Sequence, residues 1–291
     1  MKITLKIAAL AAKILPNCVK AQLYCHPRLA QRIRTSLNEA APNGLVKTKI
    51  AGGLNEGLWF NLDMQTEKDY WLGTYEMNLQ AAIRQYCSEG MVIYDVGANI
   101  GYVSLLFARL VGETGKVFAF EPLPANFQRL AANIAMNKLS SRISCFQVAV
   151  VDKTGSTSFL VHQSGAMGKA QGSLGREENY LSKITVPAIA LDDFIFSQGH
   201  PNPHVIKMDI EGGEVLAIQG MRRTLSEIKP LLFLEIHSHA ALEFLWDEFQ
   251  KANYELLKMV KGYPPITAPA TLGERTYAIA LPHQNSASSV K

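Results

Sequence analysis

Short apolar runs of strand length alternate with helical patterns through the middle of the chain. Residues 91–97 and 116–122 are apolar runs, and each is followed by apolar residues at helical spacing, over 102–111 and 125–137; a third apolar run covers 143–151. Buried strands separated by helices indicate a parallel sheet that is covered by helices on both faces. The pattern therefore predicts an α/β fold.

The alternation breaks after the third run and resumes near residue 204. Residues 155–162 have the pattern of an extra strand, a glycine-rich polar segment follows over 163–183, and residues 184–191 are extended. The pattern then predicts further strands at 204–210, 231–237, 254–260 and 276–282, and helices at 192–198, 214–221 and 240–252. The polar tail 283–291 is predicted to be disordered.

The first 45 residues have a helical pattern, and residues 46–63 suggest a small β-hairpin. In the first helix, Lys2, Lys6 and Lys13 share one narrow face beside an apolar stripe of Ile3, Ile7, Leu10 and Ile14. Such a helix more often packs on its own protein, and the alternative is peripheral contact with an anionic membrane surface. The short apolar core and the missing small-residue cleavage site argue against a secretory signal, and no stretch is long enough to span a bilayer.

Composition narrows the classes of function. The chain has 291 residues, of which 48% are hydrophobic and 19% charged, with a net charge of +4 and no cluster of Lys and Arg. This balance gives no support for a nucleic-acid partner. Cys18, Cys25, Cys87 and Cys145 lack metal-ligand spacing and are interpreted as free thiols in a reducing, cytoplasmic compartment. The oligomeric state is not indicated.

An acidic loop containing two glycines follows the first apolar run. Asp95 precedes Gly97 and Gly101, but Asn99 stands where a dinucleotide fingerprint has its second glycine. The loop therefore suits a positively charged ligand, such as S-adenosylmethionine, better than a pyrophosphate. Glu121 ends the next predicted strand, where a carboxylate can accept hydrogen bonds from ribose hydroxyls.

Charged side chains also end two later strands. Lys207, Asp209 and Glu211 alternate along one strand, and Glu235 and His237 along the next, so each set is expected on one face. His237 is the first candidate for a general base because an unperturbed imidazole has a pKa near neutrality, and Asp209 or Glu211 is the second. Lys207 is expected to neutralise one of these acids. A divalent metal held by some of Asp209, Glu211, Glu235 and His237 is an alternative that the sequence does not favour.

Several ordered motifs resemble the FkbM family of S-adenosylmethionine-dependent methyltransferases. They are "LGTYE" at 72–76, the stretch 92–134 from "VIYDVGANIGYVS" to "LAANI", "VIKMDIEGGEVLAIQGM" at 205–221 and "FLEIH" at 233–237. The resemblance covers residues 66–282. It implies a Rossmann-like seven-stranded sheet, mostly parallel with the last strand antiparallel, and O-methylation of a hydroxyl or carboxyl on a sugar, glycan, polyketide or other natural product.

Matched residue by residue, the resemblance implies a cofactor-binding set of Glu76, Asp95, Gly97, Asn99, Gly101, Glu121, Asn126 and Ala149. Residues 1–65 form an N-terminal helical and hairpin extension without a family motif. The segment 163–183 is interpreted either as a mobile lid, in which Arg176 and Lys183 meet an acidic acceptor, or as a solvent loop.

Other classes fit less well. A nicotinamide dehydrogenase conflicts with the missing central glycine, and a nucleic-acid N-methyltransferase would often end the fourth strand in Asn/Asp-Pro-Pro-aromatic, whereas Asp209 is followed by Ile-Glu-Gly. A non-catalytic scaffold with this fold remains an alternative. The sequence does not identify the acceptor.

Overall fold

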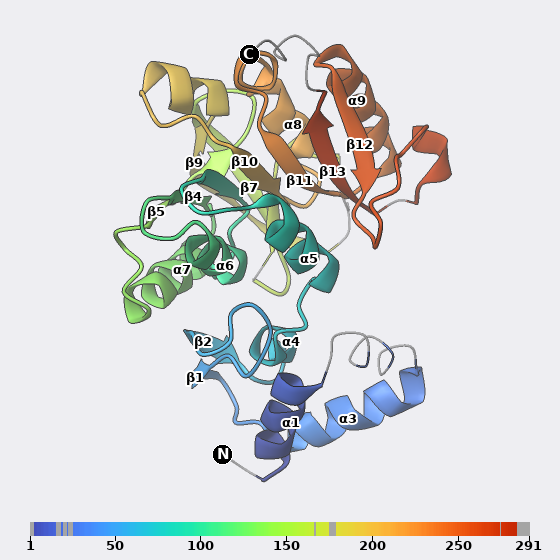
Figure 1. The fold of residues 1–291 in the computed structure, drawn as a ribbon. Coiled ribbons are helices and arrows are strands. Elements are labelled where there is room, and N and C mark those ends of the chain that lie inside the picture. Colours follow the sequence, from blue (N-terminus) through green and yellow to red (C-terminus); the bar gives the residue numbers. More distant parts are fainter. Residues whose placement is uncertain are drawn as a thin grey trace.

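A computed structural model describes residues 3–15, 19, 22, 26–165, 167–174, 179–273 and 275–283. Its centre is a seven-stranded sheet in the order β12-β13-β11-β10-β3-β4-β5 (Figure 1). All neighbours are parallel except β13, which runs antiparallel to β11 and β12, so the predicted fold class is confirmed. The strands are β3 (Val92–Val96), β4 (Lys116–Phe120), β5 (Ile143–Phe146), β10 (Val205–Met208), β11 (Leu231–Ile236), β12 (Tyr254–Lys258) and β13 (Thr276–Pro282).

Alternate strand residues enter two hydrophobic layers because successive side chains point to opposite faces of a sheet. Ile93 packs in one layer and Tyr94 in the other. The first layer lies under α5 (Met77–Tyr86), α6 (Tyr102–Leu110) and α7 (Pro124–Met136). The second lies under α8 (Glu214–Gln219), α9 (His239–Lys251) and the short helical turns η1 (Asp193–Ser197) and η2 (Thr224–Ile228).

The apolar run 143–151 is not one strand, which corrects the sequence-based prediction. It divides into β5 and β6 (Ala149–Val150), and β6 belongs to a second sheet in the order β6-β9-β7-β8. The other strands of this second sheet are β7 (Gly155–His162), β8 (Gly168–Ala170) and β9 (Tyr180–Ile189). The run divides because β5 reaches the end of its partner β4 at Phe146, and the chain then pairs with β9.

The N-terminal region contains helices and a hairpin, as predicted. Helix α1 (Ile3–Ile14) packs on α3 (Pro27–Ala40), and β1 (Leu45–Lys49) pairs antiparallel with β2 (Trp59–Asp63). The short helix α4 (Lys68–Leu72) follows. Figure 1 shows this region at the opposite end of the molecule from α9.

Polar contacts join the hairpin to α7. Asn133 Oδ1 accepts from the backbone N–H of Asn61 at 3.0 Å, and Arg129 donates to the Asn61 carbonyl at 2.8 Å. Within the described residues, no helix combines the length and the hydrophobicity needed to cross a bilayer. The expected disordered tail lies outside the described residues beyond His283.

Candidate active site

The loop after β3 approaches the end of β10 so closely that it needs glycine. Gly97 has φ +79°, and a Cβ there would lie 1.9 Å from the backbone oxygen of Asp209. The loop is held by N–H groups of Gly97 and Ala98, which donate to the Phe120 carbonyl at 3.0 and 2.9 Å. Lys207 Nζ donates to the Gly97 carbonyl at 2.9 Å. The ends of β3, β4 and β10 are thereby fixed together.

Glu121, at the carboxyl end of β4, faces this loop. Its carboxylate accepts from the backbone N–H of Asn99 at 2.9 Å and of Leu123 at 3.0 Å, and from Asn126 Nδ2 at 3.4 Å. Burial raises the pKa of Glu121 to about 7, although these donors and Lys207 oppose the shift. The buried carboxylate therefore sits where a ligand with hydroxyl groups could bind it.

A cavity of about 850 Å³, counting the open space at its mouth, lies at the carboxyl ends of β3, β4 and β10. Of the residues matched to the cofactor set, those lining it are Gly97, Asn99, Glu121, Asn126 and Ala149. Tyr70, Tyr75 and Met167 also line it, and none of the three was predicted as a site residue, although Tyr75 lies in the motif 72–76 and Met167 in the segment 163–183.

Three members of the predicted cofactor set are not among the residues lining this cavity. Asp95 is fully buried beneath the loop, and Gly101 begins α6, where a Cβ would meet Leu130. Glu76 instead lines a small neighbouring cavity together with Asp209 and Glu235. Direct contact between Asp95 and a ligand in the large cavity is therefore not what the structure indicates.

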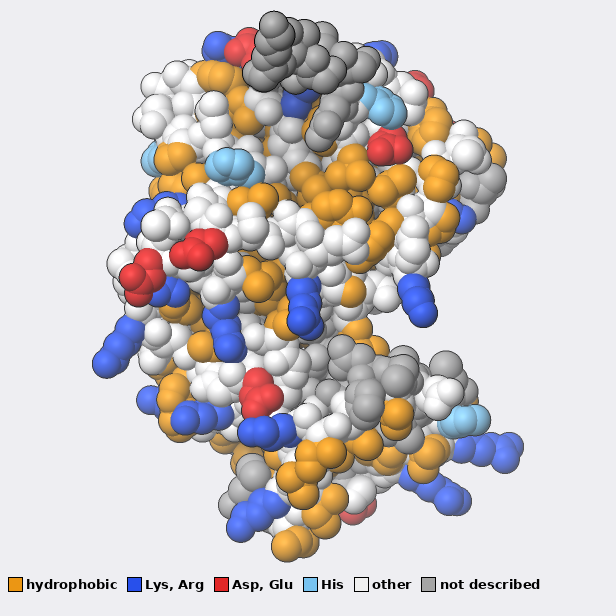
Figure 2. Space-filling view, viewed as in Figure 1, with side chains coloured by type: hydrophobic (Ala, Val, Ile, Leu, Met, Phe, Trp, Pro, Cys, Tyr) orange, Lys and Arg blue, Asp and Glu red, His pale blue; other side chains and the backbone are white. Residues whose placement is uncertain are grey.

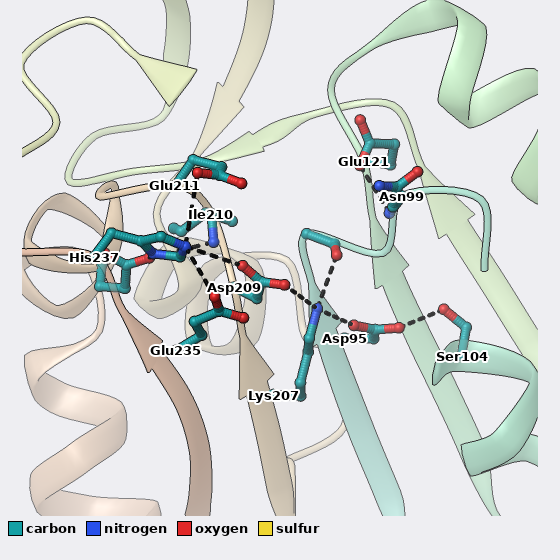
Figure 3. Close-up of polar contacts among 12 residues, drawn as sticks. Asp95, Asn99, Ser104, Glu121, Lys207, Asp209, Ile210, Glu211, Glu235 and His237 are labelled. Carbon is teal, nitrogen blue, oxygen red and sulfur yellow. Dashed lines mark hydrogen bonds and ion pairs between the residues drawn. The ribbon is translucent and has the colours of Figure 1, made fainter. Parts of the chain in front are cut away.

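Asp95 anchors a buried chain of charges. Ser104 Oγ donates to Asp95 Oδ2 at 2.5 Å, and Lys207 Nζ lies 3.4 Å from Asp95 Oδ1 and 3.8 Å from Asp209 Oδ2 (Figure 3). The ammonium thus neutralises Asp209, as the sequence predicted, and Asp95 as well. Burial lowers the pKa of Lys207, but Asp95 and Asp209 outweigh burial and raise it, so the ammonium stays charged.

The two predicted strand-end pairs meet around one imidazole. His237 Nε2 lies 3.3 Å from Glu235 Oε1, 3.7 Å from Asp209 Oδ1 and 3.7 Å from Glu211 Oε2 (Figure 3). Glu235 and His237 are buried, and the side chains of Asp209 and Glu211 are each 20% exposed. Asp209 and Glu211 line the large cavity, so the cluster begins at its wall and continues behind it.

The surroundings of His237 correct the reason for choosing it as the base. Burial lowers its pKa, but the contacts with Glu214, Glu235 and Asp209 outweigh burial and raise it to about 10. Burial raises the pKa of Asp209 to about 8, and Glu235 and Glu76 add to that rise while Lys207 opposes it. The imidazole is therefore not a free base at neutral pH while its neighbours carry their charges.

Glu214 and Arg275 complete the cluster, and neither was predicted as a site residue. Glu214 Oε1 is 3.0 Å from His237 Nδ1 and also accepts from the backbone N–H of Ile210 and of Gly212. Arg275 donates a hydrogen bond to Glu235 Oε1 and forms an ion pair with it. The sequence placed Glu214 only in the first turn of a helix, and Arg275 lies forty residues from its partner, so local patterns could not pair them.

Non-glycine residues with positive φ gather at the site. Glu76, Asn99 and Glu211 have φ values of 44°, 50° and 55°. Such conformations cost about 1–3 kcal/mol each and persist only where surrounding contacts impose them. Glu211 therefore leaves the strand geometry assumed in the sequence, yet its carboxylate still reaches His237.

The glycine-rich segment forms part of the cavity wall. Gly168–Ala170 pair with β7, and Met167, Gly168 and Ala170 line the cavity. Leu174 N–H donates to the Gly212 carbonyl at 2.9 Å, which ties the segment to the loop after β10. Lys183 is exposed on β9 and is not among the lining residues, while Arg176 lies outside the described residues, so their contact with an acceptor stays a prediction.

The fold and the cavity together define a Rossmann-like domain of the methyltransferase type. The sequence model of the FkbM methyltransferase domain matches residues 95–256, more than half of the chain, and the matched range contains both the glycine loop and the His237 cluster. The chain belongs to the FkbM methyltransferase family.

Three curated relatives are similar to this chain. The hexuronic acid methyltransferase AglP of Haloferax volcanii is 28% identical over 183 residues, which is 63% of this chain and 67% of AglP. The 2-O-methyltransferase NoeI of Sinorhizobium fredii is 32% identical over 47% of this chain and 60% of its own length. The 31-O-demethyl-FK506 methyltransferase FkbM of Streptomyces tacrolimicus is 27% identical over 45% of this chain and 60% of its own. The matched region therefore spans about three fifths to two thirds of each relative.

Proposed function

We propose that the protein is an S-adenosylmethionine-dependent O-methyltransferase acting on a hydroxyl, or a carboxyl, of a sugar, glycan, polyketide or other natural product. The observation that carries the proposal is Glu121, a buried carboxylate beside the glycine loop at the end of β4. A carboxylate in that position can accept hydrogen bonds from both hydroxyls of a ribose. Membership of a methyltransferase family supports the reaction class.

The charges around the cavity suit this cofactor. S-adenosylmethionine, when bound, supplies a methyl group that its sulfonium activates for in-line displacement. Asp209 and Glu211 present carboxylates to the cavity, so the site favours a cationic ligand over a phosphate. Ala149 and Asn126 line the part of the cavity near Glu121, where the adenosine would lie.

The acceptor would lie toward Asp209 and Glu211, under the wall formed by β7 and β8. An acceptor hydroxyl would attack the methyl carbon of the bound cofactor while the carbon–sulfur bond breaks and the sulfur leaves as a neutral thioether. The proton of the hydroxyl would pass to Asp209 in its ionised form. Holding the hydroxyl in line with the methyl group supplies much of the catalysis, because a well-oriented pair reacts as one molecule. AglP and NoeI are consistent with a sugar acceptor or another hydroxyl acceptor for this chain.

Calorimetry with S-adenosylmethionine tests the cofactor. We expect wild-type protein to bind one molecule per chain, and Glu121→Ala to bind it at least about ten-fold more weakly, because two ribose hydrogen bonds are worth about 1–3 kcal/mol. Glu113→Ala is the control, since this side chain is 89% exposed and is not among the residues lining the cavity. Absence of binding by the wild type would favour the non-catalytic scaffold.

Transfer of a labelled methyl group tests the reaction. Incubation with labelled S-adenosylmethionine and a panel of uronic acids, glycans and macrolides should label at least one class. Asp209→Asn should abolish that labelling even at saturating S-adenosylmethionine. Equal labelling by Asp209→Asn would remove the cluster from the proposed mechanism.

A further inference from the structure

Glu214 holds the Nδ1 side of the buried His237 imidazole, which leaves Nε2 directed at other carboxylates. Glu214 Oε1 accepts two backbone N–H groups, from Ile210 at 3.3 Å and Gly212 at 3.2 Å, so it acts as an acceptor toward Nδ1 at 3.0 Å. The proton of the imidazole is thus fixed on Nδ1. Nε2 is buried without a hydrogen-bond partner and points at three carboxylates.

The distances around Nε2 are longer than those of strong, charge-assisted hydrogen bonds. A charge-assisted N–H···O bond measures about 2.7–2.9 Å, whereas the oxygens of Glu235, Asp209 and Glu211 lie 3.3, 3.7 and 3.7 Å away. Neighbouring ligands of an ion at about 2.0–2.3 Å are separated by about 3.0–3.5 Å, which follows from tetrahedral or octahedral geometry. The gap therefore fits a metal ion better than a proton.

The charge balance points the same way. The ligand atoms of Asp209, Glu235 and His237 all lie within 4.8 Å of one another. The carboxylates in contact around them outnumber the permanent cations, Lys207 and Arg275. Glu235 Oε2 is also buried without a hydrogen-bond partner. A site with one imidazole and several carboxylates suits Mn²⁺ or Mg²⁺.

We propose that Asp209, Glu235 and His237 bind a divalent cation of the Mn²⁺ or Mg²⁺ type, with Glu211 as a further oxygen ligand from the cavity side. Glu214 is the positioning residue, because a carboxylate on Nδ1 orients a metal-binding imidazole. The role of the ion rests on the proposed function: at the cavity wall it would coordinate the acceptor oxygen and lower the pKa of its hydroxyl. This reverses the preference drawn from the sequence, which did not favour a metal.

Mn²⁺ is the probe for this site. The full chain is stripped with chelator, and Mn²⁺ binding is followed by calorimetry and electron paramagnetic resonance. We expect one bound Mn²⁺ per chain and, in pulsed spectra, nitrogen coupling from a directly bound imidazole. His237→Gln and Glu235→Gln should each weaken binding at least about ten-fold, and Glu214→Gln about 10- to 100-fold.

His239→Gln is the matched control, because His239 is an exposed histidine two positions along the chain. It should leave Mn²⁺ affinity unchanged. Absence of Mn²⁺ binding at millimolar concentration, or bound Mn²⁺ without nitrogen coupling, would overturn the proposal; the second readout needs no variant to fold. S-adenosylmethionine binding to the stripped protein is measured separately. If the cofactor binds and Mn²⁺ does not, only the metal site is contradicted. If Mn²⁺ binds and the cofactor does not, only the proposed function is contradicted.

A second, independent observation concerns α1, which turns mostly small side chains toward the protein and large aliphatic side chains toward solvent. The side facing the protein carries Leu5 and small alanines, with Ala12 buried and Ala8 and Ala9 packed against the core. The outer side carries the large residues Ile3, Ile7, Leu10 and Ile14, which are 73%, 63%, 57% and 66% exposed. We call these four residues the α1 stripe.

Cations accompany the α1 stripe. Lys6 and Lys13 are exposed on the same side of α1, and the neighbouring α3 exposes Arg28, Arg32 and Arg34. Glu39 is the one acidic residue within the spans of α1 and α3. Figure 2 shows hydrophobic side chains gathered at this end of the molecule with Lys and Arg around them. Exposed hydrocarbon beside positive charge is complementary to an anionic lipid surface.

We infer that the α1 stripe rests on an anionic membrane surface, with Lys6 at the headgroups and Lys13, which also pairs with Glu56, beside it. Flotation with vesicles of phosphatidylcholine and phosphatidylglycerol tests this, against vesicles of phosphatidylcholine alone. We expect the full chain to bind the anionic vesicles, the double variant Ile7→Ser with Leu10→Ser to lose most of that binding, and Lys6→Gln with Lys13→Gln to weaken it several-fold.

Leu181→Ser is the matched control, because Leu181 is 75% exposed on β9. It should bind vesicles like the wild type. No binding to anionic vesicles at low ionic strength would overturn the inference. So would a dimer in sedimentation experiments that the double variant abolishes, since the stripe would then bind a second copy of the chain.

Discussion

The cluster around His237 and the helix α1 depart from the usual distribution of polar and apolar groups in opposite directions. The cluster buries ionisable side chains at the end of the central strands, whereas α1 exposes aliphatic side chains and buries alanine. The buried charges are held by reciprocal contacts, so removing one member leaves others uncompensated. The exposed aliphatic groups have no described internal partner to lose. The buried charges therefore contribute to the stability of the fold, whereas the exposed aliphatic side chains are available for contact with an external surface.

Lys207→Met should give the largest effect, because it removes the ammonium shared by Asp95 and Asp209. We expect the free energy of unfolding to fall by about 3–5 kcal/mol in urea denaturation at neutral pH. Lys13→Gln removes an exposed ion pair with Glu56, where the two side chains are 63% and 40% exposed, and should cost less than about 1 kcal/mol. Similar losses for the two variants would contradict the contrast between the regions.

Glu121 should give a pH-dependent effect of intermediate size. Burial raises its pKa from 4.5 to about 7, so the folded protein keeps a proton that the unfolded chain releases between those values. The stability that this carboxyl contributes is therefore present at low pH and is lost as the pH rises through that range, by on the order of 3 kcal/mol.

Denaturation of wild type and Glu121→Gln from pH 4 to pH 8 measures this contribution. As the pH rises, the wild type should lose unfolding free energy relative to Glu121→Gln, because glutamine does not titrate. Glu113→Gln, at a highly exposed position, should give a curve parallel to the wild type. A parallel curve for Glu121→Gln as well would show that its carboxyl has an ordinary pKa.

Gly97→Ala, compared with Gly199→Ala, should separate the cost of a steric clash at Cβ from the cost of a positive φ. Its Cβ would meet the Asp209 carbonyl at 1.9 Å, so we expect a loss of about 3 kcal/mol in unfolding experiments, with weaker cofactor binding. Gly199 has a similar φ of +73° with no atom within 4 Å of the added Cβ, and Gly199→Ala should cost only about 1 kcal/mol. Equal costs would mean that conformation alone decides.

Two positions on α1, one buried and one exposed, should differ in their effect on the free energy of unfolding, and the exposed one should give the smallest effect. Leu5 is 2% exposed, and Leu5→Ala should cost about 2 kcal/mol or more. Ile7→Ser on the other side of the helix should change the unfolding free energy by no more than about 0.5 kcal/mol. A large loss from Ile7→Ser would indicate that the stripe is part of the folding core, and would weaken its assignment to a membrane.

The sequence predicted the main sheet because buried parallel strands are continuous apolar runs. It could not predict that residues 143–151 serve two sheets, since the partner of Ala149 and Val150 is β9, which lies about forty residues further along. Apolar spacing indicates that a strand is buried. Which neighbouring strand it pairs with depends on residues far away in the sequence. The same limit applied to Gly168–Ala170, a short strand without an apolar run.

At the site, the sequence brought together Asp209, Glu211, Glu235 and His237 because alternate residues at the ends of neighbouring parallel strands share a face. It did not predict the pKa of His237, which depends on Glu214 and therefore on how α8 begins beside β11. Asp95 was matched to the cofactor by its position before the loop, but only the fold shows that Lys207 and Ser104 occupy its carboxylate.

The second sheet has a consequence for how this chain could be altered. Strands β6, β9, β7 and β8 come from the continuous stretch 149–189 and pair with one another, while the register of β3, β4 and β10 is set elsewhere. Lengthening or replacing the β7–β8 hairpin would reshape one wall of the cavity without shifting any central strand. Under the proposed function, exchanging this hairpin among relatives is the most direct route to an enzyme with a different acceptor and the same methyl donor.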